Sequence, residues 1–184
     1  MMRRVTLERI LNDPTFQKYI SRSGLAHAIA VAENAFEIAL REHVSVDLAC
    51  KAGLLHDIGH YTWYREDGKW DFDKYRENDI HAIKGASRAH ELLVRLGEDL
   101  KNAKQIAIAI LLHTDSYLPA GTLHLEPLQK VVAQADAMDE EPDGRHHYRR
   151  IELDEARRRI EMLDTKIDRV LTRKLTEPSR RLAL

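Results

Sequence analysis

Apolar residues recur at intervals of three and four positions along most of this chain of 184 residues. The clearest series is Leu25, Ile29, Ala32, Ala35, Phe36 and Ala39. This spacing places the side chains on one face and predicts an amphipathic helix over residues 24–41. After a short break, Ser45 is a suitable N-cap for a second helix, which would carry an apolar stretch as far as His56.

Four further helices are predicted downstream. Their approximate ranges are 79–96, 100–113, 128–138 and 153–175, the last being long and highly charged. Residues 61–78 and 114–122 are predicted to be loops, and Pro142-Asp143-Gly144 is a predicted turn. No segment alternates polar and apolar residues as a half-buried strand does. The pattern therefore predicts an all-α fold, and because no linker divides the chain, we expect residues 1–184 to form a single domain.

Composition and charge narrow the class of protein. Hydrophobic residues make up 43% and charged residues 32% of the chain, which is typical of a soluble globular domain. The formal net charge of -1 offers no broad basic surface for nucleic acid. The longest apolar run, 106–112, is far shorter than the roughly 20 residues of a spanning helix, and the N-terminus lacks the apolar core of a signal peptide. We therefore expect a cytoplasmic protein with no membrane partner.

The residues with the most distinctive chemistry lie in or at the ends of apolar helical stretches. His56 and Asp57 follow directly after the apolar run 52–55. Other such residues are His27, His81, His113 and Asp136. Each of them alone is more simply explained as a half-buried or capping side chain. Several separate helices, however, each place His or Asp where burial is costly unless the group is paired or bound to metal, so the joint pattern predicts a metal site.

The ligand types indicate which metals would bind. Four imidazoles and two carboxylates favour Fe, Mn, Co, Ni or Zn over Mg or Ca, which prefer oxygen ligands. The single cysteine, Cys50, excludes an internal disulfide and is most simply a core residue. Asp57 can bridge two cations through its two oxygens, which an imidazole cannot do. The expected cofactor is therefore a divalent transition metal.

The order His, His-Asp, His, His, Asp, read from His27 to Asp136, resembles the HD-domain superfamily of metal-dependent phosphohydrolases. The tetrapeptide His-Asp-Ile-Gly that begins at His56 resembles its HDIG branch. The chain is also similar to two-metal members such as the YqeK-like dinucleoside polyphosphate hydrolases and the HD-GYP phosphodiesterases. The resemblance implies an HD-domain bundle of about six to eight helices, with the motif core at 24–140 and a charged C-terminal helix at 150–176.

The same resemblance assigns the metal ligands. It implies that two ions are bound and that Asp57 bridges them. The first ion would be held by His27, His56, Asp57 and Asp136, and the second by Asp57, His81 and His113. No GYP motif is present, which argues against cleavage of cyclic di-GMP.

Three residues are expected to contact substrate. Lys84 lies one turn after His81 on the same helical face, where a cation beside two metals would suit a phosphate. His60 occupies a position at which many relatives have Lys, and Arg145 lies beyond the last predicted ligand. We expect Asp57 and Lys84 to be the catalytic residues.

The sequence allows two roles for each of several aromatic and histidine side chains. Trp63, Tyr64 and Trp70 either stack on a base or anchor the loop that follows the His-Asp pair. His146 and His147 either face the pocket or lie in solvent, and we favour solvent.

The leading functional hypothesis is hydrolysis of a phosphoester or phosphoanhydride bond, with a small phosphorylated molecule such as a nucleotide as substrate. A second hypothesis is a di-iron oxygenase of the same superfamily, which oxygen-dependent substrate oxidation would reveal. A third is a non-catalytic metal- or nucleotide-binding regulator, which shows no turnover of phosphate esters. The sequence does not decide the oligomeric state, and a homodimer is compatible with it.

Overall fold

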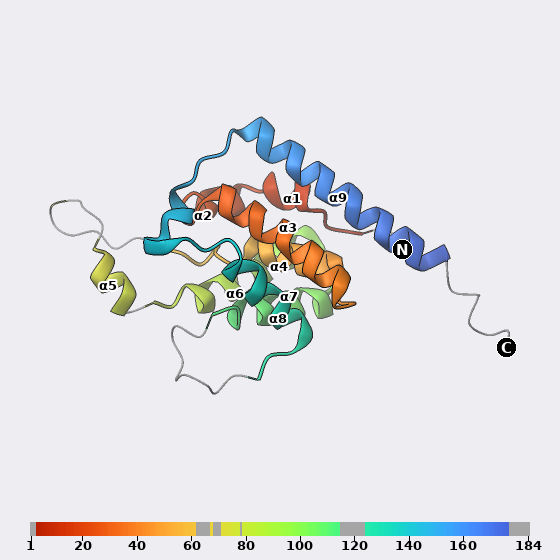
Figure 1. The fold of residues 1–184 in the computed structure, drawn as a ribbon, viewed down its shortest axis with the longest axis horizontal. Helices are drawn as coiled ribbons and strands as arrows, with labels where there is room; N and C mark the ends of the chain where they lie inside the picture. The colour runs from red at the N-terminus through yellow and green to blue at the C-terminus, as the bar shows by residue number, and fades with distance from the viewer. Residues whose placement is uncertain (1–2, 62–66, 68–70, 78, 115–123, 177–184) are drawn as a thin grey trace.

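The computed structural model describes residues 3–61, 67, 71–77, 79–114 and 124–176, and no β-strand occurs among them (Figure 1). The elements are α1 (Leu7–Leu11), α2 (Pro14–Ile20), α3 (Leu25–Arg41), α4 (Val46–Leu55), α5 (Phe72–Glu77), α6 (His81–Leu96), α7 (Leu100–Leu111), α8 (Pro127–Ala137), the 3-10 helix η1 (Pro142–Tyr148) and α9 (Leu153–Thr176). The prediction of an all-α fold is confirmed.

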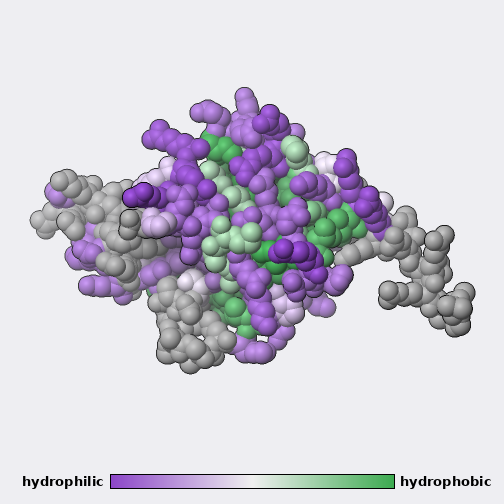
Figure 2. Space-filling view, viewed as in Figure 1, coloured by the Kyte–Doolittle hydropathy of each residue, from purple (hydrophilic) through white to green (hydrophobic). Residues whose placement is uncertain are grey.

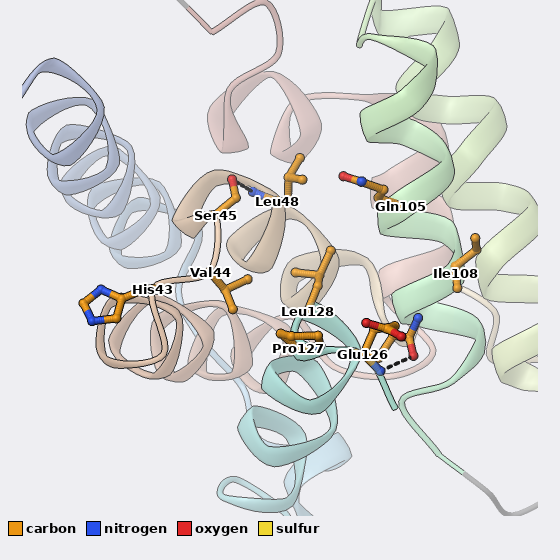
Figure 3. A pocket seen from close by; sticks show the side chains of 10 residues that line it. His43, Val44, Ser45, Leu48, Gln105, Ile108, Glu126, Pro127 and Leu128 are labelled. Atoms are coloured by element: carbon orange, nitrogen blue, oxygen red, sulfur yellow. Dashed lines mark hydrogen bonds between the residues drawn. The ribbon is translucent and has the colours of Figure 1, made fainter. Parts of the chain in front are cut away.

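Local capping explains why the predicted helices begin where they do. The Ser45 side chain accepts a hydrogen bond from the backbone N–H of Leu48 at 3.4 Å and starts α4, as expected (Figure 3). At the start of α8, the backbone N–H of Glu126 donates to the Gln129 side chain at 2.9 Å, and Pro127 occupies the first turn, where its missing N–H costs nothing (Figure 3). The predicted helices α3, α4, α6, α7, α8 and α9 are all present.

Three parts of the sequence-based assignment need correction. Helix α5 lies inside the stretch predicted as a loop, and the side chain of Asp71 begins it by accepting from the backbone N–H of Lys74 at 3.0 Å. The predicted turn at Pro142 is the start of η1, which continues to Tyr148. Helices α1 and α2 were not anticipated.

Helix α1 has a cap that comes from the other end of the chain. The Asp164 carboxylate, on α9, accepts hydrogen bonds from the backbone N–H groups of Leu7 and Glu8, both at 3.0 Å. These donors have no partner inside the helix because they belong to its first turn. A five-residue helix of this kind depends on tertiary contacts, so periodicity alone does not predict it.

The core is built around α3 and α4. Helix α3 packs against α4, α8 and α9, and α6 packs against α7, which in turn contacts α4. Figure 1 shows α9 along one edge of the molecule and α5 standing away from the body on the opposite side. All ten residues of α4 are buried. The helix that leads to the His-Asp pair therefore lies at the centre of the bundle.

Buried charges of α4 are paired with those of neighbouring elements. The ammonium of Lys51, 1% exposed, lies 2.7 Å from a carboxylate oxygen of Asp47 and 2.6 Å from one of Glu98. The Arg3 guanidinium contacts Asp47 at 3.3 Å and Asp164 at 2.8 Å. Such pairs offset the cost of desolvating the charges and join α4 to both ends of the described chain.

The hydropathy and the hollows of the surface do not distinguish between the candidate functions. Figure 2 shows a face that is mainly hydrophilic, with separate small hydrophobic areas. A hollow of about 460 Å³ lies between the α3–α4 turn, α7 and the start of α8, and its lining contains none of the six predicted ligands (Figure 3). No helix in the described part of the chain is both long enough and apolar enough to cross a bilayer.

Candidate metal centre

Two of the predicted ligands follow helix ends in the same way. His56 comes directly after α4, and its Nδ1 lies 2.8 Å from the carbonyl oxygen of Gly53. His113 lies just beyond α7, and its Nδ1 lies 2.6 Å from the carbonyl oxygen of Ile110. Each carbonyl belongs to the last helical turn, where it has no intrahelical partner. Because a carbonyl only accepts, each Nδ1 carries the proton and each Nε2 presents a lone pair.

The other two imidazoles have carboxylate partners. His27, in the first turn of α3, has Nδ1 2.7 Å from a carboxylate oxygen of Asp139. His81, the first residue of α6, has Nδ1 2.6 Å from a carboxylate oxygen of Asp79. Carboxylates in this position orient a ligating histidine and raise its basicity. In the neutral form of each of these four imidazoles, Nδ1 therefore carries the proton and Nε2 is the atom that can bind a metal.

The four Nε2 atoms form two close pairs. The Nε2 atoms of His27 and His56 lie 3.2 Å apart, and so do those of His81 and His113. In the neutral imidazoles neither Nε2 of a pair carries a proton, so the two atoms would not hydrogen-bond to each other. A cation between them would satisfy both.

Asp57 lies between the two pairs. Its Oδ2 faces the first pair, at 3.4 Å from His56 Nε2 and 3.7 Å from His27 Nε2. Its Oδ1 faces the second pair, at 3.7 Å from His81 Nε2 and 3.8 Å from His113 Nε2. One carboxylate thus presents one oxygen to each histidine pair.

Asp136 completes the first group. Its Oδ1 lies 3.2 Å from His27 Nε2 and 3.3 Å from His56 Nε2, and its Oδ2 lies 3.9 Å from His113 Nε2. The structure therefore brings the six predicted ligands together, and all six are buried. Their assignment as metal ligands stays a prediction.

The electrostatics of the centre favour a cation. Burial would raise the pKa of Asp57, but His56 and His60 outweigh it and hold the pKa well below its usual range. Burial opposes protonation of His56, yet Asp57 and Asp136 raise its pKa well above the ordinary value. Burial lowers the pKa of His113 to about 4, which keeps that imidazole neutral. The two carboxylates therefore favour positive charge at the first histidine pair, and a divalent transition metal would supply that charge in place of a proton.

The glycine of the His-Asp-Ile-Gly motif allows α6 to approach. A Cβ on Gly59 would lie 1.8 Å from the carbonyl oxygen of His81 and 2.3 Å from the backbone nitrogen of Gly85. Only glycine permits this contact between backbones. The motif therefore sets the position of His81 as well as providing His56 and Asp57.

The predicted substrate residues have different environments. His60 is close to the centre: its Nε2 lies 3.0 Å from Asp57 Oδ1, and its ring stacks on that of His81 at 4.4 Å. The Lys84 ammonium lies 4.1 Å from the centre of the Tyr61 ring, and Lys84 is half-buried. Arg145 is exposed on η1. Their roles toward substrate stay predictions.

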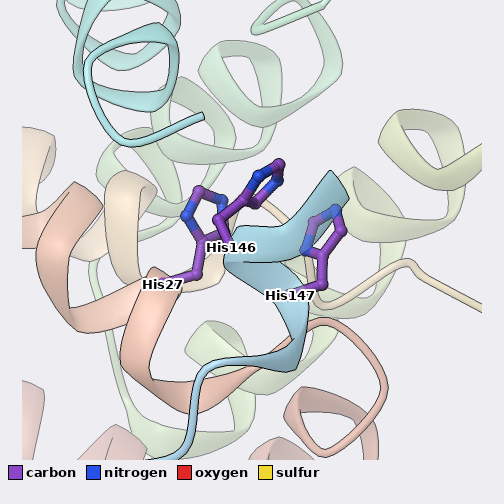
Figure 4. A group of neighbouring side chains, drawn as sticks. All are labelled: His27, His146 and His147. Atoms are coloured by element: carbon purple, nitrogen blue, oxygen red, sulfur yellow. The ribbon is translucent and has the colours of Figure 1, made fainter. Parts of the chain in front are cut away.

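The expectation that His146 and His147 lie in solvent is wrong. His146 is buried and His147 is half-buried, because η1 continues past the predicted turn and returns the chain to α3 (Figure 4). The His146 ring lies 4.5 Å from that of His27, and His147 Nδ1 lies 3.7 Å from Asp57 Oδ2.

The orienting carboxylates were also missed by the sequence reasoning. Asp79 lies two residues before His81, and Asp139 lies three residues after Asp136. An acid close to a predicted ligand is a weak signal, since most such acids are solvated. Trp63, Tyr64 and Trp70 lie outside the described residues.

Comparison with known proteins identifies relatives. The family model described as "HD domain" matches residues 24–141. The Bacillus subtilis (strain 168) protein "Putative phosphohydrolase YueE" is 60% identical over 167 residues, covering 91% of this chain and 94% of that protein. The chain is also similar to the crystal structure of a "predicted HD superfamily hydrolase" from an uncultured Thermotogales bacterium, with a TM-score of 0.51 and 24% identity. The match covers 93% of this chain and 92% of that one, and it supports the fold.

Proposed function

We propose that this chain, which belongs to the HD domain family, uses two divalent metal ions to hydrolyse a phosphoester or phosphoanhydride bond of a nucleotide. That it is a metal-dependent phosphohydrolase follows from the family match and from the similarity to a protein named as a phosphohydrolase. The number of ions and the nucleotide are the proposed parts. A cytoplasmic location also stays a prediction.

The placement of Asp57 carries the proposal of two ions. Its two oxygens face different histidine pairs, and each pair has Nε2 atoms 3.2 Å apart. We assign His27, His56, Asp57 and Asp136 to the first ion, and Asp57, His81 and His113 to the second. When bound, two such ions activate water and stabilise negative charge on phosphoryl oxygens.

The chain's own groups would position and insulate this chemistry. Asp139 and Asp79 fix the rings of His27 and His81, while backbone carbonyls fix those of His56 and His113. The ligands need little movement to bind metal, because their Nδ1 atoms are already held. The substrate would approach from the side of His60, with Lys84 and Arg145 providing positive charge for its phosphates.

The decisive experiment combines metal analysis with a nucleotide panel. Purified protein is assayed for Fe, Mn, Co, Ni and Zn, and then for phosphate release from nucleotides with each metal. We expect metal-dependent release from at least one nucleotide, and none from Asp57→Asn. Oxygen-dependent oxidation without phosphate release would favour a di-iron oxygenase instead. Metal and nucleotide binding without turnover would favour a regulator.

A further inference from the structure

The 3-10 helix η1 places two imidazoles beside His27, one member of the first histidine pair. The ring centroid of His146 lies 4.5 Å from that of His27 and 4.0 Å from that of His147 (Figure 4). A ring nitrogen of His146 lies within 4.8 Å of ring nitrogens of both neighbours. His146 is only 7% exposed. These side chains are not among the six predicted ligands.

The start of α3 holds η1 in place. His147 Nδ1 donates to the carbonyl oxygen of Ser23 at 2.8 Å. The next residue, Gly24, has φ of 95°, and a Cβ there would lie 2.7 Å from the carbonyl oxygen of His147. Glycine is therefore required for η1 to lie this close to α3. The position of His146 is set by this backbone contact.

His146 differs from the four imidazole ligands in its hydrogen bonding. The backbone N–H of Glu141 donates to His146 Nδ1 at 2.9 Å. A nitrogen that accepts a hydrogen bond carries no proton, so the proton of this imidazole is on Nε2. In the four predicted ligands the order is reversed, because their Nδ1 atoms face acceptors. In this neutral tautomer, His146 offers a hydrogen-bond donor at Nε2, where the predicted ligands offer a lone pair.

We propose that His146 binds a phosphoryl oxygen of the substrate through its Nε2–H, beside the ion assigned to His27 and His56. This inference rests on the proposed function. Phosphoryl oxygens only accept hydrogen bonds, and the donor that His146 offers is uncharged. An uncharged donor is not repelled by the adjacent cations. His146 then orients the phosphoryl group without competing with the metals.

The test measures phosphate binding separately from metal binding. His146→Phe keeps an aromatic ring but removes the donor, and His146→Gln restores an N–H. Tyr148→Phe, an exposed position on the same helix, is the matched control. Each protein is loaded with Mn²⁺, its metal content is measured by elemental analysis, and inorganic phosphate is titrated in by calorimetry.

We expect His146→Phe to keep the parent's metal content and to bind phosphate at least about tenfold more weakly, since the lost hydrogen bond is to a charged group. His146→Gln should recover part of this loss, and Tyr148→Phe should match the parent. If Phe prevents folding, His146→Ala removes the donor without added volume and carries the same expectations.

Two results would overturn the proposal while leaving the proposed function intact. Unchanged phosphate affinity in His146→Phe would show that no donor contact exists. Loss of metal from a folded His146→Phe protein would show that the ring is a ligand. If the parent itself neither binds phosphate nor releases it from any nucleotide, the proposed function and the role of His146 are both wrong.

Discussion

Replacing Gly59 by alanine should separate the two halves of the metal centre. The added Cβ would lie 1.8 Å from the carbonyl oxygen of His81 and 2.8 Å from the Cα of Gly85. Both contacts are with backbone, so no side-chain rotation can relieve them. The N-terminal turn of α6, which carries His81, must move away from the turn that carries His56 and Asp57.

The size of this movement follows from the contacts. Ordinary contact begins near 3.4 Å, so the carbonyl of His81 must withdraw by about 1.6 Å. Metal-ligand distances tolerate only about 0.2 Å. His81 should therefore move away from the proposed second ion, whereas His27 and Asp136 are not among the groups nearest to the added Cβ. Overpacking costs about 3 kcal/mol, which would lower Tm by roughly 10 °C in a domain of this size.

The assay follows metal content, stability and rate on the same sample. We expect Gly59→Ala to fold, to bind about half the parent's metal and to lose most turnover. Gly97→Ala is the control, because the added Cβ meets no atom within 4 Å. Its φ of 91° still strains an alanine, so some stability is lost without any clash. It should lose about 1 kcal/mol of stability and no metal. A folded Gly59→Ala protein with full metal content and full rate would refute the reasoning.

Other substitutions test individual groups. Asp57→Ala should sharply lower metal content and abolish phosphate release, and retained activity in this variant would refute the assignment of Asp57. Lys84→Ala should mainly raise KM. His113→Ala should keep about half the metal and lose most turnover, as elemental analysis and rates will show, and an unchanged protein would indicate one ion. Asp139→Asn should weaken metal affinity about 10–100-fold in a metal titration. The exposed Asp154→Asn is its control and should bind metal as the parent does.

The sequence predicted those features that depend on local pattern. Helix α4 was recognisable because Ser45 caps an apolar run, and the His-Asp pair follows that run. The structure adds the distances between residues far apart in the chain. It brings Asp136 to 3.2 Å from His27, which no spacing along the sequence reveals.

The features that were missed depend on tertiary contacts. Helix α1 is capped by Asp164, more than 150 residues away, so its own sequence contains little of the signal. The solvent prediction for His146 and His147 failed because it treated Pro142 as a turn and took no account of the approach that Gly24 permits. Asp79 and Asp139 become distinctive only once the rings that they contact are known.

The capping of α1 by Asp164 also affects when the N-terminal segment can reach its final contacts during synthesis. Arg3 and the first turn of α1 emerge from the ribosome early, but their carboxylate partner on α9 is made more than 150 residues later. Until then, Arg3 lacks the carboxylate of Asp164, which lies 2.8 Å from its guanidinium in the folded protein. The contact that caps α1 therefore closes a loop of more than 150 residues and can form only after α9 has been translated.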